Sequence, residues 1–182
     1  APAAAEQLAA PFAAVTPEQR VPVLEHDGVR LTQSLAIMEY LEESHPAPPL
    51  LPADPVSRAR ARALAQLVAC DIHPLNNLSV LVYLRRELGA DDTAVNAWYR
   101  HWVVRGLRAI EAHLRAAPAP YCCGESPGLA DACLVPQLYN ARRFDCDLSD
   151  VPEAVRIEQA CLALAAFDDA RPERQGDAPG GA

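Results

Sequence analysis

Five prolines fall within the eleven residues from His45 to Pro55, and this stretch constrains the fold of the chain more than any other. Proline lacks a backbone N–H and fixes φ, so a segment this rich in proline forms neither a helix nor a central strand. We therefore expect a stiff linker at residues 46–54, between a small part at residues 1–45 and a longer part at residues 55–167. The tail at residues 168–182, rich in glycine, proline and aspartate, is expected to be disordered.

The part before the linker has the pattern of a hairpin followed by a helix. Two short apolar strands flank Asp27-Gly28, a dipeptide that strongly favours a two-residue hairpin turn. The second strand leads into a helix that begins near Ser34 and ends before His45, since its apolar residues recur at helical spacing. Residues 3–14 are rich in alanine and could form one more helix. No convincing strand follows the linker, so the predicted fold class is α+β.

Two pairs of residues in this first part suit a peptide-like ligand. If the Val21-Pro22 bond is cis, the chain turns there and the neighbouring backbone amide groups face outward. Gln33 and Ser34 place an amide, a hydroxyl and the N–H groups of a helix N-terminus side by side, which suits a carboxylate. The same residues also fit a simple hairpin, a trans proline and a capped helix, so two interpretations stand at this point.

The part after the linker reads as helices throughout. Asp54 followed by Pro55 starts a helix that is expected to run to residue 88, with a kink near residue 70 caused by Pro74. A helix of about 25 residues is predicted from Asp91. Its expected inward positions are Trp98, Trp102, Leu107, Ile110 and Leu114. A very apolar helix at residues 129–144, interrupted by Pro136, and a last helix at about residues 151–166 complete this part.

Two polar groups stand out on these apolar helices. His73 and Asn77 lie four residues apart near the expected kink, so they would share one face of a regular helix and could line a ligand cleft. The alternative is a buried histidine and asparagine that satisfy each other. Arg142 and Arg143 end the most apolar helix, where they could either complement the helix dipole or bind a carboxylate in bidentate fashion.

Composition excludes several classes of function. A net charge of −8 without a basic run argues against nucleic-acid or membrane-surface binding. No apolar run approaches the length of a membrane span, and the first residues lack the basic region of a signal peptide, so we expect a cytoplasmic protein. The six cysteines fit neither a zinc site nor a disulfide framework, so free thiols are expected. The sequence also lacks metal-ligand clusters, phosphate-binding glycine loops and serine-hydrolase elbows, and no metal site is predicted.

The sum of these features resembles the glutathione transferases, and most closely their zeta class, which includes maleylacetoacetate isomerases and bacterial maleylpyruvate isomerases. The resemblance covers the chain from about Glu6 to Phe167. The stretches that carry it are Arg20–Leu24, Leu31–Leu41, Leu50–Pro52, Asp71–Leu78, Ala130–Gln137 and Asn140–Phe144.

The resemblance implies a partial thioredoxin-like domain followed by the all-helical domain of this family, and glutathione as the cosubstrate. It implies that Pro22 is the cis-proline, beside which the Val21 backbone pairs with the cysteinyl part of glutathione. Gln33 and Ser34 would hold the γ-glutamyl end. His73 and Asn77 match positions that reach over the glutathione site, often from across the interface of a homodimer. Arg143 matches the arginine that binds a substrate carboxylate, and Arg142 matches less closely.

The implied reaction is the glutathione-dependent isomerisation of an unsaturated diketo diacid, maleylacetoacetate to fumarylacetoacetate, in the degradation of tyrosine, phenylalanine and other aromatic compounds. Maleylpyruvate is the second candidate substrate. Two departures accompany the match. The family's first strand, helix and strand, with the Ser-Ser or Ser-Cys motif that activates the thiol, would precede residue 1, so no catalytic residue is assigned. We expect either a partial gene product or a binding protein without turnover. The second departure is Gly128, where relatives have serine or threonine, and we expect the helix to form regardless.

Overall fold

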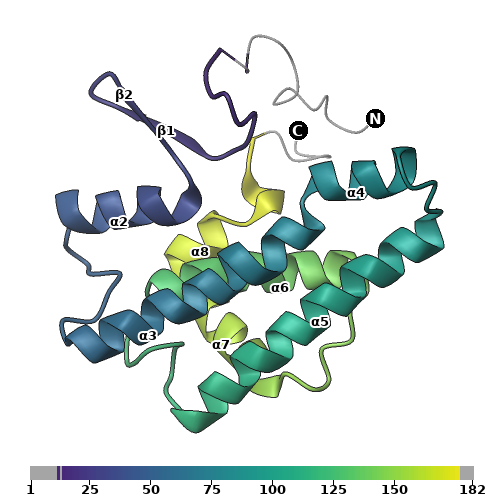
Figure 1. Cartoon of the computed structure of the whole chain (residues 1–182). Coiled ribbons are helices and arrows are strands. Elements are labelled where there is room, and N and C mark those ends of the chain that lie inside the picture. Colours follow the sequence, from purple (N-terminus) through teal and green to yellow (C-terminus); the bar gives the residue numbers. More distant parts are fainter. Residues whose placement is uncertain (1–11, 13, 177–182) are drawn as a thin grey trace. The chain divides into compact units, whose positions relative to one another are not determined.

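The computed structural model describes residue 12 and residues 14–176, and it divides the chain into two compact units, Ala1–Pro49 and Leu50–Ala182. The division falls inside the expected linker at residues 46–54. The helix considered for residues 3–14 lies, apart from residues 12 and 14, outside the described residues. Figure 1 shows the elements of both units along the chain.

Within its described residues, the first unit contains a β-hairpin followed by a helix, as the sequence predicts. Strands β1 (Val23–His26) and β2 (Val29–Thr32) are antiparallel, and Val23 pairs with Thr32 at the open end. Asp27 and Gly28 both have positive φ, 50° and 77°, which is the geometry of the tight turn that matches the twist of a hairpin. Helix α2 (Ser34–Ser44) follows β2 after a single residue and packs on that strand.

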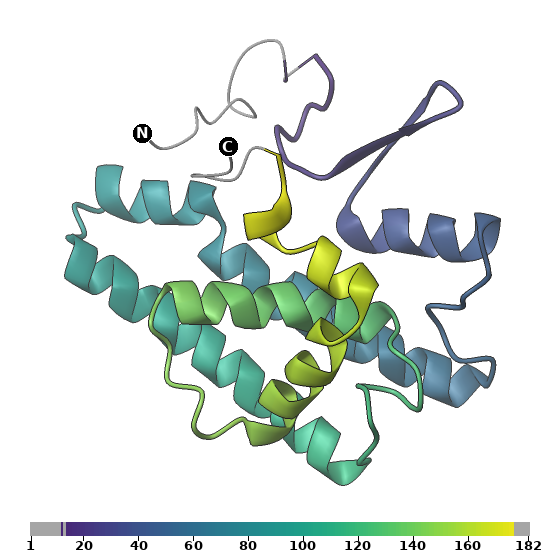
Figure 2. The same ribbon diagram turned by 180° about the vertical axis from the view of Figure 1, so that it is seen from behind.

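The second unit is entirely helical within the described residues. Its elements are α3 (Pro55–Gln66), a π-helical segment η2 (Leu67–Ile72), a 3₁₀ turn η3 (His73–Asn76), α4 (Leu78–Arg86), α5 (Asp92–Ala116), α6 (Leu129–Arg143), α7 (Pro152–Leu162), α8 (Ala165–Asp169) and a 3₁₀ turn η4 (Pro172–Arg174). Figure 1 views this unit from the side of α3 and α5, and Figure 2 from the side of α6 and α7. Helix α6 packs against α3 and α7, and α7 packs in turn against α5.

The helix that begins at Pro55 leaves the regular α form at Leu67–Ile72, close to the predicted kink, but it does not run to residue 88, because the chain bends out of the helix at the extended Asn77. The Asp54 carboxylate accepts the Ser57 N–H at 2.8 Å and caps the first turn. Pro74 cannot donate, and the chain accommodates it by widening to the π form, in which the His73 N–H reaches back five residues to the Val68 carbonyl. The stretch Pro55–Arg86 is long and apolar enough to cross a membrane by length and composition alone. We read it as a core element because it is broken at this bend and packs on α5 and α6.

The core of the helical unit is built around one face of α5. Its buried apolar residues recur every three or four positions and are Val95, Tyr99, Val103, Leu107, Ile110 and Leu114. The predicted inward positions Leu107, Ile110 and Leu114 are therefore confirmed, whereas Trp98 and Trp102 are only half-buried. These two tryptophans form an edge-to-face pair on the flank of the stripe, and Trp98 donates its indole N–H to the Leu75 carbonyl. The core face of α5 is therefore indicated by the helical spacing of its apolar residues, and the two large tryptophans lie beside it.

Helix α6 runs through Pro136 without a break, so the predicted interruption was wrong. It begins at Leu129 although Gly128 offers no side-chain cap, because the buried Asp131 carboxylate accepts the backbone N–H groups of Gly128 and Cys122. Gly128 has a packing role as well, since a Cβ there would lie 2.4 Å from the Leu50 carbonyl oxygen.

The expected disordered tail is also corrected in part. Helix α8 extends to Asp169 and η4 spans Pro172–Arg174, so residues 168–176 are structured. The reason is local charge pairing, since Arg171 and Arg174 both pair with the Asp168 carboxylate. Residues 177–182 lie outside the described part of the chain.

Candidate functional site

The open end of the hairpin brings four of the predicted site residues together. Because Val23 pairs with Thr32, the segments Val21-Pro22 and Gln33-Ser34 lie next to each other just beyond the last pair. The Val21-Pro22 bond is cis, so the trans alternative was wrong. The strand pairing stops at Val23, and the Val21 side chain is 68% exposed. This end of the unit therefore offers backbone and side-chain hydrogen-bonding groups at the surface.

Gln33 adopts an unusual backbone conformation. Its φ of 71° and ψ of 116° place a non-glycine residue outside the common regions, at the point where β2 turns into α2. Such conformations cost roughly 1–3 kcal/mol and cluster at functional sites. In the part of the chain that the structure describes, neither the Gln33 amide nor the Ser34 hydroxyl has a hydrogen-bond partner. The first backbone bond of α2 is donated by Ile37, so the preceding N–H groups are open to an anion.

The polar residues near Pro74 differ in backbone conformation and burial, because the helix ends between them. Asn77 is extended, with φ −62° and ψ 147°, so it does not share a regular helical face with His73, and that prediction was wrong. The reason is that the 3₁₀ turn ends the helix at Asn76. The Asn77 oxygen caps α4 by accepting the Ser79 N–H at 3.1 Å, which leaves its amide NH₂ available. His73 is exposed and Asn76 is the buried member, so the interpretation of His73 and Asn77 as a buried pair is excluded.

The two arginines at the end of α6 have different surroundings. Arg142 pairs with Glu158 of α7 through two bonds, from Nη1 to Oε1 at 2.7 Å and from Nη2 to Oε2 at 2.6 Å. Within the described residues, Arg143 has neither an ion pair nor a hydrogen bond, and its guanidinium carbon lies 6.0 Å from the centroid of the Phe144 ring. Arg143 is therefore the arginine that is available to an external carboxylate.

The end of α6 is fixed by contacts from α5 that the sequence analysis missed. Arg100 donates to the Phe144 carbonyl at 2.7 Å, and Tyr99 stacks on the Phe144 ring with centroids 3.7 Å apart. Burial raises the pKa of Tyr99 to about 12, so its phenol is neutral across the physiological range. These partners lie 44 and 45 residues apart along the chain, and no local pattern in the sequence could have indicated them.

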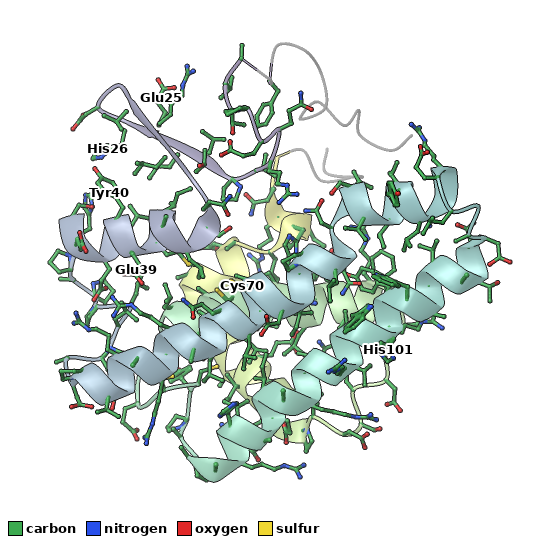
Figure 3. All side chains as sticks on the ribbon, viewed as in Figure 1. Glu25, His26, Glu39, Tyr40, Cys70 and His101 are labelled. Atoms are coloured by element: carbon green, nitrogen blue, oxygen red, sulfur yellow. The ribbon has the colours of Figure 1, made fainter. Side chains whose placement is uncertain are left out.

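The remaining histidines and the cysteines give no sign of catalysis. His26 lies 2.6 Å from the Tyr40 hydroxyl, and the His101 ring packs edge-to-face on Trp102. Figure 3 shows His26 and Tyr40 close together in the first unit and His101 on α5. All six cysteines are free. Burial raises the pKa of Cys123 and Cys133 to about 11 and that of Cys161 to about 12, so these thiols are poor nucleophiles at neutral pH.

The described residues of the helical unit line at least two cavities. One, of about 430 Å³, is bounded by α6, α7 and the C-terminal turns, and Tyr139 and Glu158 are among its lining residues. The other, of about 610 Å³, lies between α3 and the segment that follows α5, and its lining is mostly apolar, with Arg60 and His113 among the polar residues.

Comparison with known proteins gives matches over both units. Residues 4–49 match the family model for the N-terminal domain of glutathione S-transferases, and residues 58–145 match the model for the C-terminal domain. A probable maleylacetoacetate isomerase of Vibrio cholerae is 47% identical over 173 residues, which are 95% of this chain and 80% of the relative.

Solved structures give the same result. A holo maleylpyruvate isomerase, described as a bacterial glutathione S-transferase of the zeta class, is 47% identical and superposes with a TM-score of 0.93 over 96% of this chain and 83% of that chain. A maleylacetoacetate isomerase of Methylobacterium extorquens AM1, with bound malonate and glutathione, is 39% identical with a TM-score of 0.93 over 97% of this chain and 84% of that chain.

Proposed function

The chain belongs to the zeta class of glutathione transferases, and on that basis we propose that it is a glutathione-dependent cis–trans isomerase of an unsaturated diketo diacid. Maleylacetoacetate is the proposed substrate, converted to fumarylacetoacetate in the breakdown of tyrosine, phenylalanine and related aromatic compounds, and maleylpyruvate is the second candidate. The observation that carries the proposal is that each unit has an open polar site, with Gln33 and Ser34 on one unit and Arg143 on the other.

Glutathione fits the groups at the open end of the hairpin. The Val21 backbone beside the cis-proline offers an N–H and a carbonyl to the cysteinyl part of the tripeptide. Ser34 and the free N–H groups of α2 offer donors to the γ-glutamyl carboxylate, which the positive end of a helix also favours. The Gln33 amide adds a donor and an acceptor. His73 and the free Asn77 amide are proposed to contact glutathione from the helical unit.

The diacid is assigned to Arg143. Its guanidinium is the fork that matches a carboxylate in bidentate fashion, and the described residues supply no carboxylate to occupy it. Bound glutathione supplies the thiol that adds to the cis double bond and leaves again once the bond has rotated. Arg143 holds the substrate carboxylate and stabilises the negative charge that develops beside it, a role that commonly supplies a large share of catalysis.

We also propose that the protein is a cytoplasmic homodimer. Three large apolar side chains are exposed on or just after α4, namely Leu78 at 47%, Tyr83 at 57% and Leu88 at 63%. We propose that these residues contribute to the interface with a second copy, since contiguous exposed apolar surface marks interaction sites. The cap residue Asn77 directly precedes this surface, so a second copy bound there would lie close to His73 and Asn77.

The experiment that tests the proposal is an assay of maleylacetoacetate isomerisation with and without glutathione, together with retention of the protein on immobilised glutathione. We expect retention and a rate that depends on glutathione. Retention with no rate would identify a glutathione-binding protein without turnover. Loss of both, in a protein with normal helical circular dichroism, would contradict the glutathione site as well.

A further inference from the structure

The ion pair between Arg142 and Glu158 joins the last turn of α6 to α7. Each nitrogen of the Arg142 fork contacts one oxygen of Glu158, Nη1 to Oε1 at 2.7 Å and Nη2 to Oε2 at 2.6 Å, and Arg142 also donates to the Leu138 carbonyl at 3.4 Å. The Glu158 side chain is only 5% exposed, whereas that of Arg142 is 46% exposed. The pair therefore has one buried partner and a well-defined geometry.

Stability alone does not account for a carboxylate at this position. Burial raises the pKa of Glu158, and the opposing effects of Arg142 and Arg171 do not cancel that rise. Removing a carboxylate from water costs free energy that a single partner often fails to offset, so apolar residues of similar size serve a core at least as well. A buried pair of this kind is better explained by the geometry that it imposes.

The pair fixes the direction in which the neighbouring Arg143 leaves the helix. Successive residues of an α-helix point about 100° apart, so holding Arg142 toward α7 also sets the direction of Arg143. The turn beyond is held as well, since the Cys146 N–H bonds to the Ala141 carbonyl at 2.9 Å and Arg100 to the Phe144 carbonyl at 2.7 Å. Arg143 itself is left without an ion pair among the described residues.

We propose that Arg142 and Glu158 are positioning residues, which hold the last turn of α6 so that Arg143 is oriented for a substrate carboxylate before the substrate binds. The inference rests on the proposed role of Arg143 and deepens it. A guanidinium held in place loses less conformational freedom on binding than one on a frayed helix end, so the pair raises affinity for the diacid without touching it.

The test measures the dissociation constant of malonate, a non-reacting diacid, for the full chain saturated with glutathione. The variants are Glu158→Gln, Arg143→Ala and the double variant, and Arg142→Lys is a second way of removing the fork. We expect Glu158→Gln and Arg142→Lys each to weaken malonate binding by about tenfold, with the affinity for glutathione unchanged. In the Arg143→Ala background, Glu158→Gln is expected to have no further effect.

The matched control is Glu153→Gln, which breaks the Glu153–Arg156 pair on the same helix α7, away from the end of α6. It is expected to leave malonate binding unchanged. If Glu158→Gln weakens binding equally with and without Arg143, or does not weaken it at all, the positioning role is overturned while the site at Arg143 stands. If Arg143→Ala itself leaves malonate binding unchanged, the proposed carboxylate site is wrong and the positioning role falls with it.

Discussion

At the scale of single residues, three of the side chains proposed to bind ligand make no bond within the part of the chain that the structure describes. They are Gln33, Ser34 and Arg143. By contrast, the Asn77 oxygen caps α4, and Arg142 pairs with Glu158. Substitution at the open positions is therefore expected to change binding far more than stability.

Replacement of Arg143 by alanine tests the carboxylate site. We expect the KM for the diacid to rise by roughly thirtyfold, about 2 kcal/mol, because a charged partner is lost. Glutathione affinity and the melting temperature are expected to remain unchanged. Arg86→Ala, which removes an arginine from the last turn of α4, is the control. An equal loss of glutathione and diacid affinity would mean that Arg143 supports the fold rather than the substrate.

Replacement of Ser34 by alanine tests the glutathione site. The hydroxyl makes no bond within the described chain, so we expect unchanged stability and a loss of glutathione affinity of about 1.5 kcal/mol, roughly tenfold. Titration calorimetry measures the effect. Ser44→Ala at the other end of α2 is the control, because its hydroxyl bonds to the Tyr40 carbonyl. Equal effects of the two substitutions would argue against a specific role for Ser34.

The sequence predicted most of these site residues but not their surroundings. The hairpin signal and the helix start at Ser34 are local, so the neighbourhood of Pro22 and Gln33 follows from short-range rules. The distinction between Arg142 and Arg143 depends on Glu158, sixteen residues further on, and on contacts from α5. Such long-range contacts leave no periodic trace, and so the sequence alone could not separate a structural arginine from a free one.

At the scale of elements, the start signals of the helices were reliable, whereas the two prolines inside helices gave one correct and one wrong prediction. The aspartate caps at Asp54 and Asp91 start α3 and α5 as predicted, since a cap is satisfied by its own helix. Pro74 and Pro136 are both helix-interior prolines, yet only Pro74 changes the helix type. Whether the helix changes its form at a proline depends on the packing around that proline, and this packing cannot be read from a single sequence.

The contact of α5 with the π-helical segment predicts a size constraint at Gly106. A Cβ at this position would lie 2.2 Å from Cγ1 of the fully buried Ile72. We expect Gly106→Ala to lower the free energy of unfolding by about 1–3 kcal/mol, although alanine is the better helix former. Gly176→Ala, with no atom within 4 Å of the new Cβ, is the control. Chemical denaturation measures both, and an unchanged midpoint for Gly106→Ala would refute this packing.

The cap of α3 predicts a pH effect in acid. The bond from the Ser57 N–H to the Asp54 carboxylate lowers the pKa of Asp54 below 3.8. Because the pKa of Asp54 is lower in the folded chain than in the unfolded chain, the cap stabilises the fold fully at a pH above the unfolded-state pKa. This stabilisation is lost as the pH falls through the folded-state pKa. Asp54→Asn keeps a good cap without a titrating group, so the gap in melting temperature between the two proteins is expected to shrink below pH 4. A constant gap would show that Asp54 does not titrate in this way.

At the scale of the whole molecule, the residues proposed to take part in the activity are distributed over both units. Val21, Pro22, Gln33 and Ser34 belong to the unit Ala1–Pro49, and His73, Asn77 and Arg143 belong to the unit Leu50–Ala182. The chain spans 80% of the Vibrio cholerae relative that it resembles. The activity is accordingly a property of the assembled molecule, and binding at either site alone would not demonstrate it.

Dimerisation through α4 is testable independently of catalysis. We expect Leu78→Asp to convert a dimer into a monomer in sedimentation analysis, because a buried carboxylate at an apolar interface lacks a partner. Leu78 is 47% exposed in the single chain, so the helical content is expected to persist. The control is Ser79→Asp on the next position of the same helix. A monomeric parent protein, or a dimer unaffected by Leu78→Asp, would exclude this surface.

The most direct test of the proposed isomerase activity is the stoichiometry of glutathione during turnover. Maleylacetoacetate is supplied at ten times the glutathione concentration, and substrate, product and free glutathione are followed together by NMR. An isomerase returns glutathione in every cycle, so we expect complete conversion to fumarylacetoacetate with the glutathione concentration unchanged. Conversion that stops once one equivalent of glutathione has been consumed would show conjugation instead. The same slow rate with and without glutathione would contradict glutathione-dependent isomerisation by this protein.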